Sequence, residues 1–196
     1  MPETTEQSFE ELPEELKQQL KGKPVNTVVF SLKHDLAVQN NGKTFTVTKI
    51  SDITKETALE SRSTPRKRKA FALTPQGFEQ NNVFLNVLQP ESYFSPQRYK
   101  AKMITQTIVK GKLGILTFND NGDIINRTVL QPNGVEKIVH GNHYYCVIAL
   151  EPDTALLEES FGKFDPSDKQ FAPWAPKENT PKALAFLEKA RREFEK

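Results

Sequence analysis

The sequence of 196 residues has few of the residue types on which several common kinds of site depend. A single cysteine, Cys146, excludes an intramolecular disulfide framework, and because it lies in an apolar run we interpret it as a small buried hydrophobe. The nine glycines are scattered among turns, which excludes a glycine-rich phosphate-binding loop. No apolar run approaches the ~20 residues that span a bilayer, and the acidic N-terminal stretch is unlike a signal peptide. We therefore expect a cytoplasmic protein with no membrane partner.

The chain also carries little excess charge of either sign. Its formal net charge of +2 is too small to indicate a nucleic-acid or membrane partner. One local exception is the stretch 62–69, which holds five basic side chains and no acidic one. Because no aromatic residues interleave with this basic run, we expect no nucleic-acid partner. The run is interpreted either as a phosphate-binding segment or as a solvated linker or intersubunit contact.

The first 49 residues are predicted to form an N-terminal extension. Apolar residues at helical spacing over 9–20 indicate a short helix, and Pro13 places the start of its ordered part. From residue 25 the apolar period changes to two, and Asn40-Asn41-Gly42 predicts a hairpin turn. The extension is therefore expected to contain a helix and a small antiparallel β unit.

Residues 50–80 are predicted to form a helix followed by a basic linker. The helix is expected to run from Asp52 to about Arg62, with Asp52 or Thr54 as its N-cap. Beyond it, residues 81–176 show short strands at spacings near ten residues, which is typical of a sandwich or barrel. The sequence thus predicts a mainly β domain after the linker.

The last 20 residues, 177–196, are predicted to form a C-terminal helix. Thr180 followed by Pro181 is a typical helix start. Ala183, Leu187 and Ala190 then mark an apolar stripe at helical spacing. This helix is expected to pack on the β domain.

The stretch from Pro96 to Gly111 resembles the first motif of the cupins. That motif has a His-x-His pair, an acid five residues after the second His, and a Gly seven residues after the acid. Here the same spacing joins Tyr99, Ile104 and Gly111. The resemblance implies a cupin double-stranded β-helix (jelly-roll) barrel, with the N-terminal helix/β-hairpin extension and the C-terminal helix added to it.

Three further segments resemble the WbuC-type cupin-fold metalloproteins. They are the basic stretch 63–68, the run 149–154 and the long closing run 164–176, and the last is the most specific. The resemblance covers about residues 50–196 and leaves 1–49 outside it. It links the chain to polysaccharide biosynthesis only through the family's genetic context.

The resemblance also implies where a metal would be held. The cupin ligand positions correspond to Gln97, Tyr99, Ile104 and Tyr145, none of which is a histidine or an acid. Imidazole nitrogens and carboxylate oxygens are the usual ligands of such ions, so we predict a degenerate site with no metal and no other cofactor. An alternative is an atypical metal site built from His140, His143 and Tyr145.

The barrel interior is predicted to be either a polar pocket or a filled core. The candidate ligand-binding residues are amides and phenols, which hydrogen-bond sugars and bases well. They are joined by one histidine, one isoleucine and three arginines near the predicted opening, which favour an anionic ligand. The set is Gln97, Tyr99, Ile104, Gln106, Tyr145, His143, Arg66, Arg68 and Arg98. No residue is assigned a catalytic role, and the carboxylate pair Glu158-Glu159 is interpreted as solvated.

Three functions remain open at this point. The first is a non-catalytic cupin-fold protein that binds a small anionic or carbohydrate-related ligand, or a protein partner. The second is a metal-independent enzyme of sugar-nucleotide metabolism, with Tyr99 or Tyr145 as acid and His143 as base. The third is a metalloenzyme with the atypical site. The resemblance also implies a homodimer, since cupin barrels commonly dimerise through strand exchange or edge pairing, which hides strand edges.

Overall fold

The computed structural model describes residues 2–75, 81–100, 103–133, 135–139, 143–161 and 165–195. The described helices are α1 (Glu14–Leu20), α2 (Ile50–Ser63) and α3 (Pro181–Arg192), with 3₁₀ turns η1 (Phe9–Glu11) and η2 (Pro166–Asp168). The first strands are β1 (Thr4–Gln7), β2 (Val28–Ser31), β3 (Leu36–Asn40), β4 (Phe45–Lys49) and β5 (Arg68–Ala72). The strands that follow are β6 (Asn81–Leu88), β7 (Gln97–Tyr99), β8 (Met103–Lys110), β9 (Leu113–Phe118), β10 (Ile124–Leu130), β11 (Val135–Val139), β12 (Tyr144–Ala149), β13 (Thr154–Phe161) and β14 (Lys169–Phe171). None of the described helices is long and apolar enough to cross a membrane.

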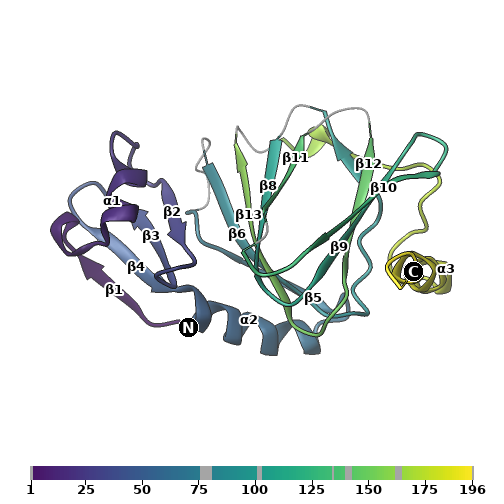
Figure 1. Cartoon of the computed structure of the whole chain (residues 1–196), viewed down its shortest axis with the longest axis horizontal. Helices are drawn as coiled ribbons and strands as arrows, with labels where there is room; N and C mark the ends of the chain where they lie inside the picture. The colour runs from purple at the N-terminus through teal and green to yellow at the C-terminus, as the bar shows by residue number, and fades with distance from the viewer. Residues whose placement is uncertain are drawn as a thin grey trace.

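The N-terminal extension folds around its own small core (Figure 1). Its sheet has the order β1-β4-β3-β2, and α1 packs on it through Leu16 and Leu20, next to Leu12 from the turn before the helix; all three are buried. The helix begins after Pro13, as the sequence indicates. Strand β1 was not predicted, because residues 4–7 carry no apolar alternation; its backbone pairing with β4 forms the strand instead.

Helix α2 connects the extension to the barrel. It begins at Ile50, two residues earlier than expected, so the prediction of Asp52 or Thr54 as N-cap is wrong. The first turn is held instead by Asp35 from the β2–β3 turn, whose carboxylate accepts from the Ser51 backbone N–H at 2.8 Å and from the Ser51 hydroxyl. Thr54 turns back on the helix and donates to the Ile50 carbonyl at 2.7 Å.

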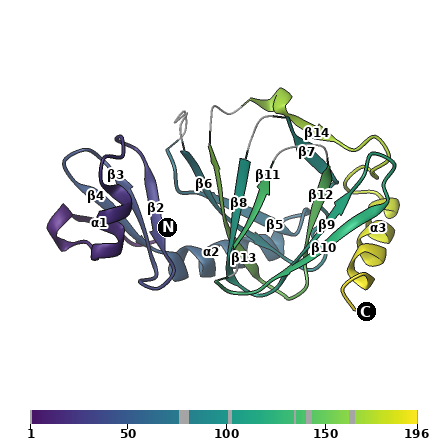
Figure 2. The same ribbon diagram turned by 45° about the horizontal axis from the view of Figure 1, so that its top comes forward.

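The barrel consists of two five-stranded antiparallel sheets (Figure 2). One has the order β11-β8-β13-β6-β5 and the other β10-β9-β12-β7-β14. Without the two edge strands β5 and β14, the eight strands β6 to β13 alternate between the sheets except at the β9–β10 hairpin, which lies within one sheet. This is the connectivity of a jelly roll, in which each sheet takes its members from both halves of the chain. The mainly β, cupin-like fold is therefore confirmed.

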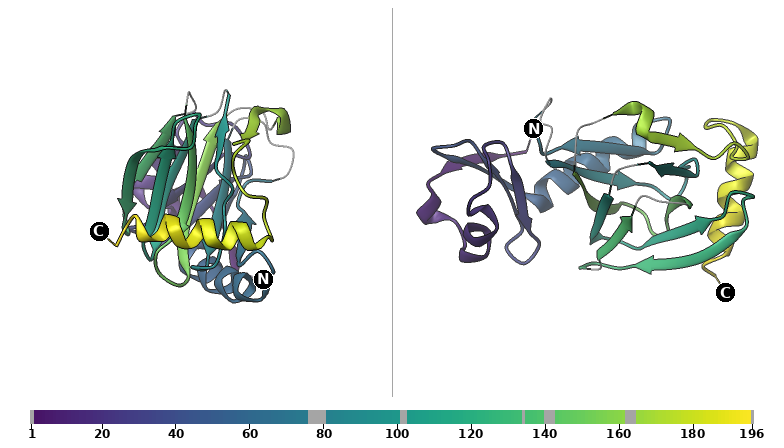
Figure 3. Two further views of the ribbon diagram at one scale, coloured as in Figure 1. Left: turned by 90° about the vertical axis from the view of Figure 1, so that its right-hand side faces the viewer. Right: turned by 90° about the horizontal axis from the view of Figure 1, so that it is seen from above.

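The alternation of side chains along each strand separates the interior of the barrel from its two outer faces. Between the sheets lies a core that includes Leu88, Ile108, Leu113 and Leu156. The outer face of the β6–β13 sheet packs on α2 and on the N-terminal sheet, and these share one continuous core. The outer face of the β9–β12 sheet is crossed by α3 (Figure 3).

Two predictions about the flanking segments differ in outcome. The prediction of a basic linker without secondary structure is partly wrong, because residues 68–72 form β5 and pair with β6, although Lys69 remains exposed. The C-terminal helix is confirmed: Thr180 caps it by accepting from the Ala183 N–H at 3.2 Å. Cys146 is also buried as predicted, and burial raises the pKa of its thiol to about 12.

Candidate functional site

The four positions that the cupin resemblance matches to metal ligands lie on barrel strands, and their side chains face the barrel interior. Gln97 on β7 and Tyr145 on β12 are direct register partners, and both side chains are buried. Tyr99 has the same parity as Gln97 on β7, and burial raises its pKa. Ile104 is buried on β8, two residues from Gln106 and on the same face.

The described part of this interior does not fit a transition metal. An amide is a weak ligand, isoleucine is not a ligand, and a phenol binds well only as phenolate. Burial raises the pKa of Tyr99 and of Tyr145 well above the usual value, so both phenols keep their protons at neutral pH. Among the described residues no group of three or more His, Cys, Asp or Glu could hold a metal ion.

The interior contains one carboxylate that the sequence reading placed elsewhere. Glu158 on β13 is the register partner of Gln106, whose amide donates to its Oε2 at 3.4 Å. Burial raises the pKa of Glu158, and its negative charge in turn raises the pKa of both Tyr99 and Tyr145. The interpretation of Glu158 as a solvated strand-end residue is therefore wrong. Its parity with the buried Leu156 was the signal that would have placed it inside.

Packing leaves little room beside these polar groups. A cavity of about 20 Å³ is lined by Gln97, Gln106, Tyr145 and Glu158, together with apolar neighbours such as Val147. This volume accommodates one water molecule and is far too small for a sugar or nucleotide. Tyr145 hydrogen-bonds the Gln97 side chain, and the Gln106 amide donates to Glu158, whereas the buried Gln106 Oε1 has no hydrogen-bond partner among the described residues. Beside these described side chains the barrel interior is therefore filled.

The histidines lie outside this cluster. His143 directly precedes β12 and its side chain is exposed, so the structure does not place it in the barrel with Tyr145. His140 is outside the described residues. His34 lies in the β2–β3 turn, with its Nε2 3.5 Å from Glu15 Oε2. The two described histidines therefore do not meet at Tyr145.

The predicted basic residues are engaged in structural contacts rather than gathered at one opening. Arg66 and Arg68 both bind the carboxylate of Glu178, at 2.9 Å from Arg66 Nε and 2.6 Å from Arg68 Nη2. They tie β5 to the segment before α3. Arg98 points out of the barrel, where it donates to Asp120 Oδ1 at 2.9 Å.

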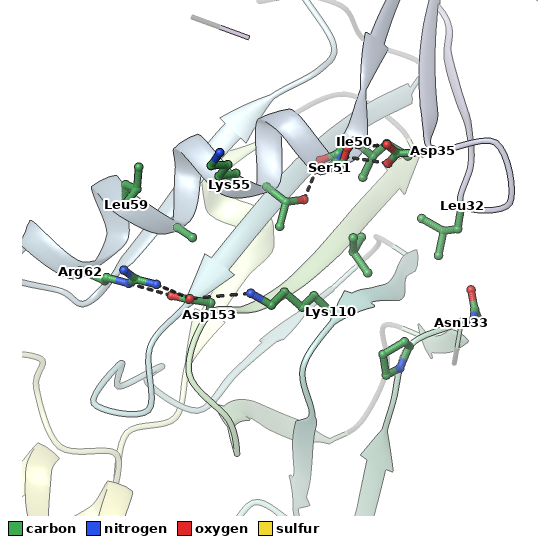
Figure 4. Close-up of a pocket in the computed structure, with 14 residues that line it drawn as sticks. Leu32, Asp35, Ile50, Ser51, Lys55, Leu59, Arg62, Lys110, Asn133 and Asp153 are labelled. Atoms are coloured by element: carbon green, nitrogen blue, oxygen red, sulfur yellow. Dashed lines mark hydrogen bonds and ion pairs between the residues drawn. The ribbon is translucent and has the colours of Figure 1, made fainter.

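A much larger cavity lies outside the barrel, where the β2–β3 turn, α2 and the ends of β8 and β13 meet (Figure 4). We call it the junction pocket; its volume is about 610 Å³. Apolar side chains from the β2–β3 turn, α2 and the end of β8 line it, among them Leu32, Leu59 and Val109, whereas Asp153 lines it just before β13 begins. No local sequence motif predicts it, because its lining residues extend from Leu32 to Asp153 in the sequence.

One end of the junction pocket carries an ordered charge cluster. Arg62 binds Asp153 through two parallel contacts, of which Nε to Oδ1 measures 3.0 Å. Gln89 donates to the same carboxylate at 2.7 Å, and Lys110 Nζ lies 3.8 Å from it. The Arg62 hydrogen bonds lower the pKa of Asp153, which therefore stays ionised. The cluster was not predicted, because Asp153 was considered only as part of a family-like segment.

Comparison with known proteins adds limited information. A domain of unknown function (DUF6016) matches residues 50–130, which is less than half of the chain. No protein among those with curated descriptions matches the sequence.

Several solved structures resemble the barrel. KdgF from Halomonas sp. is 13% identical, with a TM-score of 0.42 over 54% of this chain and 86% of that one. Streptomyces Pac13, described as a nucleoside dehydratase, is 8% identical, with a TM-score of 0.43 over 58% of this chain and 89% of that one. The pro-11S globulin of pumpkin is 9% identical, with a TM-score of 0.44 over 55% of this chain and 29% of that one. Similarities at this level carry no argument about activity, and the fold assignment rests on the strand order.

Proposed function

We propose that this chain is a non-catalytic binding protein for a small anionic ligand, built on a cupin-like barrel that has lost the family's metal ligands. The contrast between the two cavities supports the proposal. The interior beside Gln97 and Tyr145 holds about 20 Å³, whereas the junction pocket holds about 610 Å³. Small-molecule sites usually occupy roughly 300–1,000 Å³, so of these two cavities the junction pocket has the size of one. It is also larger than the surface cavities of about 310 Å³ beside Arg66 and about 410 Å³ beside Phe171.

The proposal extends to the family and to the setting of the protein. We propose a divergent relative of the WbuC-type cupin-fold proteins, because the closing run 164–176 resembles theirs and residues 169–171 complete one barrel sheet as β14. A cytoplasmic homodimer is the expected form. Sedimentation of the purified protein tests the dimer, and a monomer at micromolar concentration would contradict it.

A second candidate function is favoured by one observation. Glu158, Tyr99 and Tyr145 all have raised pKa values inside the same barrel, and perturbed groups of this kind gather at acid–base sites. In a metal-independent enzyme acting on a sugar, Glu158 would take the role of base that the sequence analysis gave to His143. The phenols would act as proton donors. This function requires the interior to open far beyond its present volume.

The test begins with the metal content of the purified protein. We expect elemental analysis to find no transition metal near stoichiometry, and added manganese, zinc or iron(II) to leave the melting temperature unchanged. A bound transition metal at one equivalent would contradict the proposal. This measurement concerns only the barrel.

The two candidate functions are then separated by ligand-induced thermal shifts. Small organic anions and sugar nucleotides are compared on the wild-type protein and on Glu158→Gln and Tyr99→Phe. Binding outside the barrel predicts that both variants keep the wild-type shift. Loss of the shift in both variants, with each still folded, would favour the acid–base site in the interior.

A further inference from the structure

We propose that the junction pocket binds a small organic monoanion, whose charged group lies against Arg62 and Lys110 and whose apolar body lies along α2. This inference rests on the proposed binding function, since it specifies where the ligand binds and to which class it belongs. It does not depend on any contact inside the barrel.

The shape of the pocket suits a ligand with an apolar body. Its volume of about 610 Å³ falls within the usual range of small-molecule sites. Leu59 on α2 is 58% exposed, although it stands beside a buried core, and Leu32 and Pro132 also line the pocket. Covering such side chains contributes roughly 25 cal/mol for each Å² of apolar surface removed from water.

The charges around the pocket favour an anion. Its described lining includes three cations, Lys55, Arg62 and Lys110, and two carboxylates, Asp35 and Asp153. Both carboxylates are already occupied, Asp35 by the first turn of α2 and Asp153 by Arg62. The lining therefore has one cation in excess, which a monoanion would neutralise.

Arg62 and Lys110 can also donate hydrogen bonds to a ligand. Arg62 uses Nε and Nη2 on Asp153, and no hydrogen bond from its Nη1 occurs within the described part of the chain. Lys110 contacts the same carboxylate only at 3.8 Å and its side chain is 58% exposed, so it can turn toward a ligand at little cost. Asp153 is held in turn by Gln89, which fixes the guanidinium in place. The result is a preorganised donor group beside an apolar wall.

A matched pair of fluorescent probes tests this directly. The anion 8-anilinonaphthalene-1-sulfonate (ANS) combines a sulfonate with an aromatic body, and N-phenyl-1-naphthylamine has the same body without the charge. We expect the folded wild-type protein to bind ANS at one saturable site, several-fold more tightly than the neutral probe. Raising the salt concentration to 0.5 M should weaken the binding of ANS but not that of the neutral probe, because salt screens the attraction between the sulfonate and the cations of the pocket.

Variants of one lysine locate the site. Lys110→Met keeps an unbranched side chain and leaves Asp153 bound to Arg62, so we expect an unchanged melting curve. Its affinity for ANS should fall about fivefold, as loss of one exposed ion pair predicts, with the neutral probe unaffected. Lys110→Glu should weaken ANS further. The control Lys182→Met changes an exposed lysine on α3, away from the pocket, and should stay within twofold of wild type.

Competitors of equal chain length test the ligand class. Octanoate should displace ANS at lower concentration than octan-1-ol, and n-octylammonium should be the weakest of the three. Wild-type ANS affinity in Lys110→Glu, or equal displacement by all three competitors, would overturn the inference while leaving the binding function standing. If ANS, the neutral probe and every organic anion in the thermal screen fail to bind, the inference and the proposed function both fail.

Discussion

Replacing Gly111 by alanine tests the retained cupin spacing most directly. This residue lies in the tight turn between β8 and β9 with φ +77°, in the left-handed region that favours glycine. A Cβ there would lie 2.9 Å from the Cα of Thr154 and 2.6 Å from its hydroxyl oxygen. Because Thr154 begins β13, the obstacle is backbone and cannot rotate away.

The expected loss has two parts. An alanine in the left-handed region costs about 1–2 kcal/mol, and forcing extra volume against fixed backbone costs about 1–3 kcal/mol more. The variant Gly22→Ala isolates the backbone cost from the steric cost, since φ at Gly22 is +72° and nothing lies within 4 Å of a Cβ added there. Gly22→Ala should therefore lose only about 1–2 kcal/mol, and Gly111→Ala about 2–5 kcal/mol. The smaller entropy of the unfolded alanine chain affects both variants alike.

Urea unfolding of the two variants supplies the measurement. The single tryptophan, Trp174, reports on the barrel by fluorescence, and far-ultraviolet circular dichroism reports on the whole chain. If the two probes give the same unfolding transition, the protein unfolds in two states and the free energies of unfolding of the variants can be compared. If Gly111→Ala loses no more stability than Gly22→Ala, the argument from close approach to Thr154 is refuted.

Three further predictions concern the buried groups. Because burial raises the pKa of Glu158, the folded protein keeps a proton that the unfolded chain releases above its usual pKa of 4.5. Its unfolding free energy should therefore fall as pH rises through the raised folded value, and Glu158→Gln should flatten this fall in urea titrations from pH 4.5 to 8. Tyr145→Phe removes the hydrogen bond to Gln97 and should lower stability by about 1–2 kcal/mol, measured by the urea midpoint; an unchanged midpoint would show that the bond contributes nothing. The Cys146 thiol, with its pKa raised to about 12, should resist maleimide at pH 8 in the native protein and react fully in urea, as seen by mass spectrometry.

Much of the barrel was predictable because alternation is a local property of the sequence. The sequence places Ile104, Gln106 and Ile108 at alternate positions, which predicts one face of a strand, and all three are buried on β8. The same rule, extended from Leu156, would have placed Glu158 inside. It was overlooked because adjacent acidic residues more often lie in solvent.

Other features depend on pairings that no local pattern encodes. Strand β1 is held by backbone bonds to β4, and β5 by bonds to β6, although Arg68 and Lys69 give β5 the composition of a linker. Asp35 caps a helix that begins 15 residues after it in the sequence. The junction pocket is the extreme case, because it exists only once segments between Leu32 and Asp153 that are far apart in the sequence have packed together.

The pairing of β6 with β13 has a consequence for how the chain folds. Asn81 lies opposite Phe161 in the register, so the first and last strands of the jelly roll are neighbours although the other six lie between them in the sequence. Closing so long a loop is slow, because its entropy is lost before the contacts form. During synthesis the barrel cannot close until β13 has left the ribosome, whereas residues 4–49 pair among themselves and can fold much earlier. The N-terminal extension then offers the core of Val28 and Ala37 as a ready surface against which β6 and α2 assemble.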